Sequence, residues 1–185
     1  FDREAPLMSL PADVVHGTTS AGNMVIMTPA LTMLEAARIS FNVSEYDRHL
    51  SGDGDLRDFG REAAEALGLS ADEVFKTLVV VSESDELIVA VLPVSCQLSM
   101  KLVAAAAKVK KVSMCDPSLA ERSSGYVVGG ISPLGQRRQL RTVIDESADL
   151  FDTIYVSGGR RGLDIGLAPA DLARVLDATI APITA

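Results

Sequence analysis

The chain contains the stretch Lys76-Thr77-Leu78-Val79-Val80-Val81, and after the five polar residues 82–86 it continues with Leu87-Ile88-Val89-Ala90-Val91-Leu92. Apolar and β-branched side chains fill both runs, and each run has the length of an ordinary strand. The polar segment 83–86 between them suits a turn. We therefore predict a hairpin of two buried strands at the centre of a sheet.

Helical signals lie on both sides of this hairpin. Thr28 followed by Pro29 is typical of the first turn of a helix, and Gly68 is a suitable end for an alanine-rich helix before it. Two further helices are predicted to begin after the capping residue Ser99 and at Pro169.

Shorter elements complete the pattern. Ser70 and Glu73 form a capping box, which predicts one more helical turn ending at Phe75. Short strands are predicted at 109–114, 126–128, 141–144, 153–156 and 163–165. Helices and strands alternate without a regular period, which indicates a mixed α/β or α+β fold; periodicity does not choose between them.

The length of 185 residues suits one domain. Residues 1–26 mix Pro, Gly, Ser and Thr with few periodic apolar positions, so we expect a flexible N-terminal extension followed by a domain over 27–185. The longest apolar runs fall far short of the roughly 20 residues of a membrane helix. No membrane association is expected.

The two cysteines, Cys96 and Cys115, allow one disulfide at most, and a domain of this size can be stable without one. The first residues are acidic and carry no basic segment followed by an apolar one, so no signal peptide is visible. We therefore expect a cytoplasmic protein.

The charge is unevenly distributed. The net charge is −8, which argues against a protein that coats nucleic acid through phosphate neutralisation. Residues 101–141 nevertheless hold 8 basic and 2 acidic side chains, whereas residues 41–90 hold 4 basic and 12 acidic ones. The basic segment is either a local anion-binding patch or a solvated face.

Common catalytic motifs are missing from the sequence. The only histidines, His16 and His49, and two cysteines 19 residues apart give little support for a metal site, so no metal or other cofactor is expected. Cys115 as a nucleophile would need His49 as its base, and a buried structural role is the simpler interpretation. No nucleophile elbow, Walker loop or dinucleotide fingerprint is present.

Glycines cluster instead in the segments 125–135 and 157–162, the second close to Asp164. Glycine lets a backbone approach a ligand closely, but it also serves tight turns between strands. Lys76 stands where the first buried strand begins, so it is either a solvated residue with its stem on the core or a functional group. The residues alone leave both questions open.

These segments resemble the YbaK family of aminoacyl-tRNA deacylases, within it the free-standing Cys-tRNA(Pro) deacylases. The resemblance covers residues 27 to about 180. It is carried by 27–30 (MTPA), 74–78 (VFKTL), 116–117 (DP), 122–136 (RSSGYVVGGISPLGQ) and 154–165 (IYVSGGRRGLDI).

The resemblance implies a single α/β domain with a mixed, barrel-like sheet flanked by helices. It also implies a reaction, the hydrolytic removal of cysteine wrongly attached to tRNA(Pro), and a transient complex with prolyl-tRNA synthetase. The residues that fall on the family's catalytic positions are Lys76, Gly129 and Asp164. Those that fall on its substrate-binding positions are Tyr46, Phe59, Thr77, Gly130, Ile131, Ser132, Pro133 and Ser157.

In the family the substrate's own thiol is thought to attack its ester and to leave as a thiolactone. The backbone amides of Gly129 and Gly130 would then face the ester carbonyl, and Lys76 would hold the terminal phosphate or ribose. Two alternatives remain: a deacylase for alanine, serine or threonine on tRNA, and a non-catalytic module that binds tRNA or a synthetase.

Overall fold

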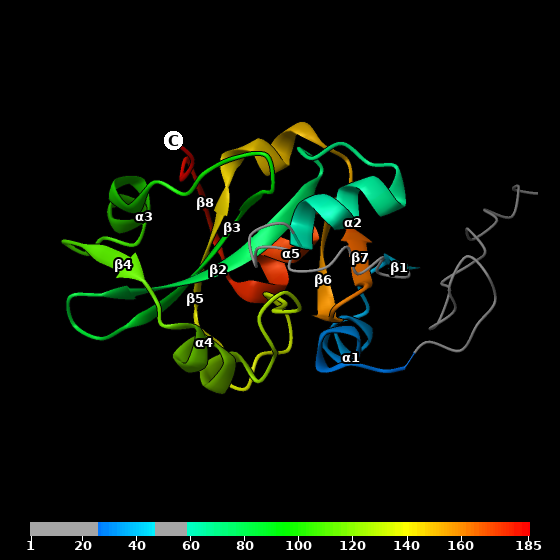
Figure 1. Cartoon of the computed structure of the whole chain (residues 1–185), viewed down its shortest axis with the longest axis horizontal. Coiled ribbons are helices and arrows are strands. Elements are labelled where there is room, and N and C mark those ends of the chain that lie inside the picture. Colours follow the sequence, from blue (N-terminus) through cyan, green and yellow to red (C-terminus); the bar gives the residue numbers. More distant parts are fainter. Residues whose placement is uncertain (1–25, 47–58) are drawn as a thin grey trace, which may run out of the picture.

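The computed structural model describes residues 26–46 and 59–185 of the chain (Figure 1). The predicted extension, except residue 26, lies outside the described residues, as does most of the polar segment between Tyr46 and Phe59. None of the helices in the described ranges is long and apolar enough to cross a membrane.

The described residues form one mixed sheet of eight strands. Along the sheet their order is β1-β7-β6-β2-β3-β5-β8, and β4 pairs with β2 beside this path. The pairs β2–β6, β3–β5 and β5–β8 are parallel, and the other pairs are antiparallel. The strands are β1 (Phe41–Glu45), β2 (Val74–Ser82), β3 (Leu87–Pro93), β4 (Val112–Met114), β5 (Arg141–Asp145), β6 (Ile154–Arg160), β7 (Leu163–Leu167) and β8 (Thr179–Ala181).

The predicted hairpin is confirmed as β2 and β3, which pair in a continuous antiparallel register from Phe75↔Pro93 to Val81↔Leu87. The capping box is also confirmed, since the Ser70 amide donates to the Glu73 carboxylate over 3.1 Å. The turn it begins ends earlier than predicted, because Val74 and Phe75 already belong to β2 and pair with β6.

The four predicted helices are confirmed, and a fifth was not predicted. The helices are α1 (Pro29–Ala36), α2 (Phe59–Leu67), α3 (Met100–Ala106), α4 (Pro117–Ser124) and α5 (Pro169–Leu176), and a 3₁₀ helix, η1 (Glu146–Leu150), follows β5. The hydroxyl of Thr28 accepts a hydrogen bond from the Leu31 amide, as its position before Pro29 predicts. Asp116 and Pro117 give α4 the same kind of start.

The prediction of a strand at 126–128 is wrong, because these residues form turns. Tyr126, which looks like a strand residue, instead anchors a loop: it is buried and its hydroxyl donates to the Leu134 carbonyl over 2.9 Å. Two short strands, β1 and β8, were not predicted. Each lies at one end of the sheet order and pairs with a single neighbour.

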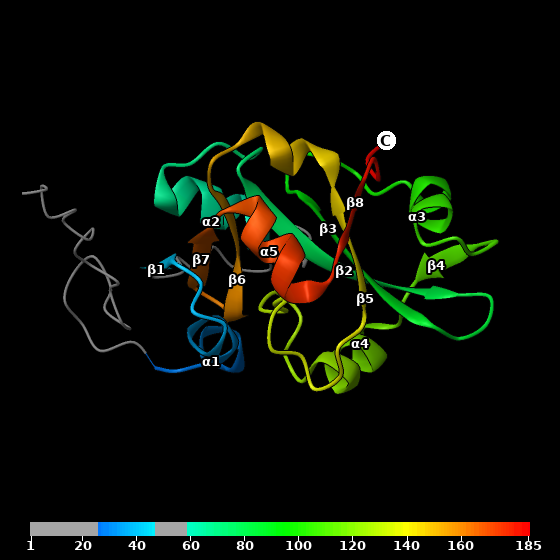
Figure 2. The same cartoon turned by 180° about the vertical axis from the view of Figure 1, so that it is seen from behind.

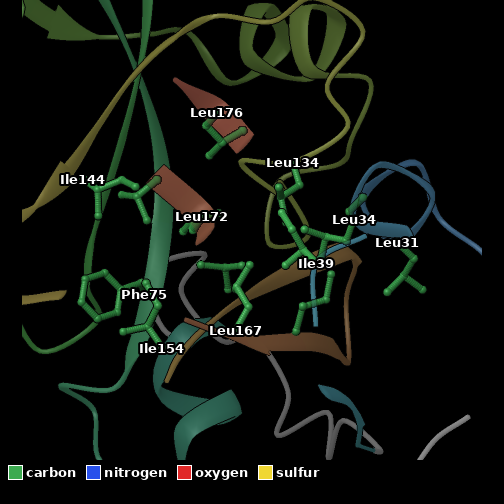
Figure 3. Close-up of a cluster of buried hydrophobic side chains, with 14 of the residues drawn as sticks. Leu31, Leu34, Ile39, Phe75, Leu134, Ile144, Ile154, Leu167, Leu172 and Leu176 are labelled. Atoms are coloured by element: carbon green, nitrogen blue, oxygen red, sulfur yellow. The ribbon is translucent and has the colours of Figure 1, made fainter. Parts of the chain in front are cut away.

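The core lies on both faces of the sheet. Alternate residues of β3 enter two clusters, with Val89 and Val91 in one and Ile88 and Ala90 in the other. The first cluster contains α1 and α5 (Figure 3), and the second contains Val103 of α3. Figure 2 shows α5 lying across the face of the sheet opposite to that seen in Figure 1. Burial on both faces explains why the hairpin sequence is apolar throughout.

Candidate functional site

A pocket of about 600 Å³ lies along one edge of β2. On that edge β6 pairs only with Val74 and Phe75, and β4 pairs only with Val80 to Ser82. The strand between these two partners is left open, and residues 74–79 line the pocket. Figure 1 shows the arrangement, with β4 at one end of β2 and β6 near the other.

The hydrogen-bond register places the backbone of Thr77 in this opening. The Val94 amide donates to the Val74 carbonyl over 2.8 Å, and the Ser82 amide donates to the Glu86 carbonyl over 2.9 Å, so even-numbered residues of β2 bond to β3. Odd-numbered residues direct their backbone groups to the other edge. The backbone N–H and C=O of Thr77 therefore face the pocket.

The side chain of Thr77 is also unpaired. Its Oγ1 is buried and has no hydrogen-bond partner among the described residues. A buried hydroxyl without a partner is uncommon, because it loses its water without replacement. Thr77 thus combines open backbone groups at the wall of the pocket with a buried hydroxyl that has no partner among the described residues.

Lys76 lines the same pocket and is half-buried within β2, which begins at Val74, two residues before the predicted start of the strand. Its ammonium donates to the Cys96 carbonyl, with 2.5 Å between Nζ and O. Burial lowers the pKa of Lys76 from its ordinary value; the nearby Cys96 opposes this change and Arg61 adds to it. The ammonium retains further protons that can bond a ligand.

Asp164 lies on β7, opposite Ser157 of β6 in the antiparallel register, and both residues line the pocket. Asp164 is 5% exposed, and its Oδ2 has no hydrogen-bond partner in the described chain. Burial raises the pKa of Asp164 to about 7, and a hydrogen bond with the Tyr46 side chain acts in the opposite direction. Asp164 therefore titrates near neutrality inside a ligand-sized cavity.

Gly129 and Phe59 form another part of the wall. Gly129 has φ +83°, and a Cβ there would lie 2.7 Å from the Phe59 ring, so only glycine fits without strain. The Arg161 guanidinium lies over the same ring, 5.0 Å from its centroid, and its Nε and an Nη bond the Val128 carbonyl. The Gly129 amide has no hydrogen-bond partner among the described residues.

The structure does not bring all the predicted residues to the pocket. Ile131 lines it, but Gly130, Ser132 and Pro133 are buried and do not. The Gly130 amide already donates to the Val127 carbonyl over 2.9 Å, and the Ser132 hydroxyl accepts from the Leu134 amide. The prediction that the Gly130 amide faces a substrate carbonyl is therefore wrong.

Several lining residues were missed by sequence analysis. They come from the segment after β3 and from α3, β4 and α4, namely Gln97, Leu98, Met100, Met114 and Ala120. No local motif marks them, because the pairing of Val80 with Met114 across the sheet brings β4 to this edge.

The described residues hold no group of three or more His, Cys, Asp or Glu side chains arranged to bind a metal ion. The pocket instead contains a lysine, a carboxyl group whose pKa is about 7, and backbone groups that have no hydrogen-bond partner among the described residues. Such a set can bind a small polar ligand and stabilise negative charge that develops on it.

The mixed sheet and this pocket define an α/β protein with a ligand-sized cavity at a sheet edge. Residues 54–175 match the model of the aminoacyl-tRNA editing domain. The chain belongs to this family, as its resemblance to YbaK deacylases had predicted.

Two relatives are similar to this chain in sequence. The chain is 34% identical over 160 residues to EbsC of Enterococcus faecalis (strain ATCC 700802 / V583), whose name proposes a Cys-tRNA(Pro)/Cys-tRNA(Cys) deacylase, covering 85% of this chain and 93% of EbsC. It is 27% identical over 111 residues to the uncharacterized protein YwhH of Bacillus subtilis (strain 168), covering 60% of this chain and 70% of YwhH.

The fold is also found in a solved structure. A crystal structure described as a proposed trans-editing enzyme for prolyl tRNA synthetase aligns with a TM-score of 0.74 and 19% identity, covering 87% of this chain and 99% of that chain. At this level of identity the similarity establishes a shared fold.

Proposed function

We propose that this protein removes cysteine wrongly attached to tRNA(Pro), as a deacylase separate from the synthetase that makes the error. The observation that carries the proposal is a pocket in an aminoacyl-tRNA editing fold whose unpaired polar groups suit an aminoacyl ester. A deacylase named for cysteine on tRNA(Pro), 34% identical to this chain, supports the choice of substrate.

The end of the pocket near β6 and β7 would bind the ammonium of the aminoacyl group. Asp164 Oδ2 and the Thr77 carbonyl are hydrogen-bond acceptors of residues that line the pocket, and neither has a partner in the described chain. A bound ammonium would satisfy both, which recovers the free energy lost when these groups were buried. Tyr46 and Ser157 would hold the carboxyl in place and complete this end.

Lys76 and the open Gly129 amide would act on the ester. An aminoacyl ester is already reactive, so the enzyme mainly positions it and stabilises the negative charge that develops on the carbonyl oxygen. The Gly129 amide suits the carbonyl oxygen, and the Lys76 ammonium suits the ribose or phosphate of the terminal nucleotide.

The nucleophile would come from the substrate. Cys115 lines the pocket, but burial raises the pKa of its thiol and its Sγ donates to the Asp116 carbonyl over 3.4 Å, so it is a poor nucleophile. The cysteinyl sulfur would attack its own ester carbon, the C–O bond to the ribose would break, and the thiol proton would pass to the ribose oxygen. The resulting thiolactone would then be hydrolysed to cysteine by water.

The cellular setting follows from the same proposal. The partners would be tRNA(Pro) carrying cysteine and prolyl-tRNA synthetase, which would supply the substrate in a transient complex. Both cysteines are free thiols, as expected in a reducing compartment, and we place the protein in the cytoplasm.

The test compares hydrolysis of Cys-tRNA(Pro) and Ala-tRNA(Pro) by the wild type and by Lys76→Met, which keeps the apolar stem and removes the charge. We expect wild-type turnover of the cysteinyl ester alone and at least about a 100-fold loss in the variant, the range typical of a lost charge-stabilising group. Arg174→Met is the control, since Arg174 is an exposed cation on α5 outside the pocket.

Each other result has a definite meaning. Preference for the alanyl ester would reject assistance by a substrate thiol, since alanine has none. Wild-type turnover by a folded Lys76→Met would reject the role of Lys76. No turnover of either ester by the wild type would leave a module that binds tRNA or a synthetase.

A further inference from the structure

The turn formed by residues 127–130 contains Gly129, which lines the pocket. The Gly130 amide donates to the Val127 carbonyl over 2.9 Å and closes the turn. Gly129 has φ +83°, whereas Val128 is not among the residues with a positive φ. This combination is typical of a type II turn, which differs from a type I turn by a flip of its central peptide. Such a flip would reverse the directions of the Val128 carbonyl and the Gly129 N–H.

Two charged side chains hold Val128, the first residue of that central peptide. The Glu121 carboxylate on α4 accepts from the Val128 amide over 2.8 Å. The Arg161 guanidinium, in the connection between β6 and β7, donates to the Val128 carbonyl from Nε over 3.0 Å and from Nη2 over 2.7 Å. Hydrogen bonds to charged groups are stronger than those between neutral groups. Both backbone groups of Val128 are therefore fixed by elements outside the turn.

Other contacts of the turn do not set the direction of this peptide. Val127 is 52% exposed, so burial of its side chain contributes little. Gly130 packs against the connection between β6 and β7, since a Cβ there would lie 3.0 Å from the backbone nitrogen of Arg161. That contact fixes the place of the turn. The bonds to Val128 decide which way its peptide with Gly129 faces.

We propose that Arg161 is a positioning residue that directs the Gly129 N–H toward the substrate, with Glu121 as the second anchor. This inference rests on the proposed function, in which the Gly129 amide binds the ester carbonyl oxygen. The described residues contain no cis peptide bond, so the C=O and N–H of this peptide point in opposite directions. By holding the Val128 carbonyl, Arg161 keeps the Gly129 N–H pointing away from itself. Its charge also polarises the peptide, which makes the N–H a stronger donor.

The position of Arg161 in the chain links this donor to the other end of the proposed substrate. The strands β6 and β7 carry Ser157 and Asp164, and Arg161 lies in the connection between them. The donor for the carbonyl oxygen and the carboxyl for the ammonium are therefore held by one hairpin. A fixed distance between these two groups is what precise placement of an ester requires.

The first experiment measures kcat and KM for Cys-tRNA(Pro) with Arg161→Met, which keeps an apolar side chain next to Phe59 and removes the donors. We expect kcat to fall at least about tenfold and KM to change much less, because the Gly129 N–H acts on charge that develops only in the transition state. Arg161→Lys keeps the charge without the rigid pair of donors, so it should restore only part of kcat. Arg174→Met is the control for loss of an exposed cation outside the pocket.

Two results of this experiment would overturn the proposal. An unchanged kcat in a folded Arg161→Met, with normal wild-type turnover, would reject the positioning role and leave the proposed function standing. Because Arg161 is exposed, its charge could instead meet a tRNA phosphate. In that case KM would rise at constant kcat and Arg161→Lys would restore it fully. Absence of wild-type turnover would reject the proposed function, and the second experiment then tests the orientation by itself.

The second experiment reads the peptide without catalysis. Val128 and Gly129 form the only Val-Gly pair in the sequence, so a protein with ¹³C-labelled valine carbonyls and ¹⁵N-labelled glycine gives a single carbonyl–amide correlation by NMR. We expect Arg161→Met to move the carbonyl signal upfield, because the carbonyl loses two hydrogen bonds, and Arg174→Met to leave it in place. If Arg161→Met does not fold, Arg161→Lys serves for the same comparison.

The same signal reports whether the Gly129 N–H meets a carbonyl. The ligand is an unreactive adenosine analogue that carries alanine through an amide instead of an ester. We expect it to move the Gly129 amide proton downfield in the wild type and much less in Arg161→Met. An identical correlation in the wild type and the folded variant, with and without the analogue, would overturn the proposal.

Discussion

Asp145 and Asp164 are both buried aspartates on strands of one sheet, with 2% and 5% exposure, but their surroundings differ. Asp145 Oδ1 accepts from the Ser147 amide over 3.1 Å and from the Ser147 hydroxyl over 2.6 Å. Its Oδ2 accepts from the Ile183 amide over 2.9 Å. Each oxygen of Asp145 is thus paired inside the fold, and the residue ties β5 to the last residues of the chain.

Asp164 has only part of this support. Tyr46 hydrogen-bonds its carboxyl, but Oδ2 has no partner in the described residues. Burial without full pairing raises the pKa of Asp164 to about 7. The carboxylate of Asp145 therefore stabilises the fold. The carboxyl of Asp164 lowers the stability of the fold and is available to a ligand.

Asp145→Ala should produce the largest loss of stability. The substitution removes three hydrogen bonds to a charged acceptor and leaves the buried Ile183 amide unpaired, so we expect the free energy of unfolding to fall by about 3 kcal/mol or more. Urea denaturation measures this loss. Because Asp145 lies outside the pocket, the folded variant should still deacylate Cys-tRNA(Pro). If the free energy of unfolding falls by less than about 1 kcal/mol, Asp145 does not stabilise the fold as the comparison with Asp164 requires.

Asp164→Asn should change how stability depends on pH. The pKa of Asp164 is raised from 3.8 in the unfolded chain to about 7 in the folded one, so its stabilising contribution is complete below pH 3.8 and is lost as the pH rises through about 7. Asparagine has no such proton to lose. The stability of the variant relative to wild type should therefore increase by about 2–3 kcal/mol between pH 5 and pH 8.

Denaturation of both proteins at several pH values tests this, and taking the difference cancels the other titrating groups. The matched control is Asp145→Asn measured over the same range. A stability difference between Asp164→Asn and wild type that does not vary with pH would show that Oδ2 finds a partner in solution.

Gly129→Ala should have a smaller effect, centred on the pocket. Alanine in the left-handed region costs about 1–2 kcal/mol, and the new methyl group would lie 2.7 Å from the Phe59 ring, so we expect a loss of about 2 kcal/mol together with reduced deacylation. Gly68→Ala is the control, because Gly68 also has a positive φ but a Cβ there would meet no atom within 4 Å. It should cost less stability and leave activity unchanged. Equal loss of activity in both variants would reject a specific role for the Gly129–Phe59 contact.

The sequence was sufficient for the elements whose signals are local. The hairpin, the helix that begins after Thr28 and the helix ended by Gly68 depend on composition and capping, and each was predicted correctly. The error at Tyr126 has a tertiary cause, since its hydroxyl is bonded to a carbonyl eight residues later and holds a loop. Strand propensity is overridden where a buried side chain finds such a partner.

The site was predicted in part for the same reason. Lys76, Thr77, Gly129, Ser157 and Asp164 lie in recognisable motifs, and the structure places all five around one pocket. The part of the pocket that Met114 and Pro117 line depends instead on the pairing of β4 with β2 and on the position of α4, which no periodicity reveals. The unpaired atoms are likewise invisible in the sequence, because a missing hydrogen bond is a property of the assembled fold.

Thr77→Val should have the smallest effect on stability. It applies the comparison of paired and unpaired buried groups to an uncharged hydroxyl. The substitution keeps the shape of the side chain and removes a buried hydroxyl without a partner, so we expect the free energy of unfolding to stay equal or to rise by less than about 1 kcal/mol. Thr142→Val is the matched control, because Thr142 is buried on β5 and its hydroxyl donates to the Leu140 carbonyl over 3.1 Å; there the same change should destabilise. Deacylation should persist in both variants, because Thr77→Val keeps the backbone carbonyl that is proposed to bind the ammonium. If both variants lose equal stability, the Thr77 hydroxyl has a partner in solution, and the backbone groups of Thr77 would remain as its contribution to the pocket.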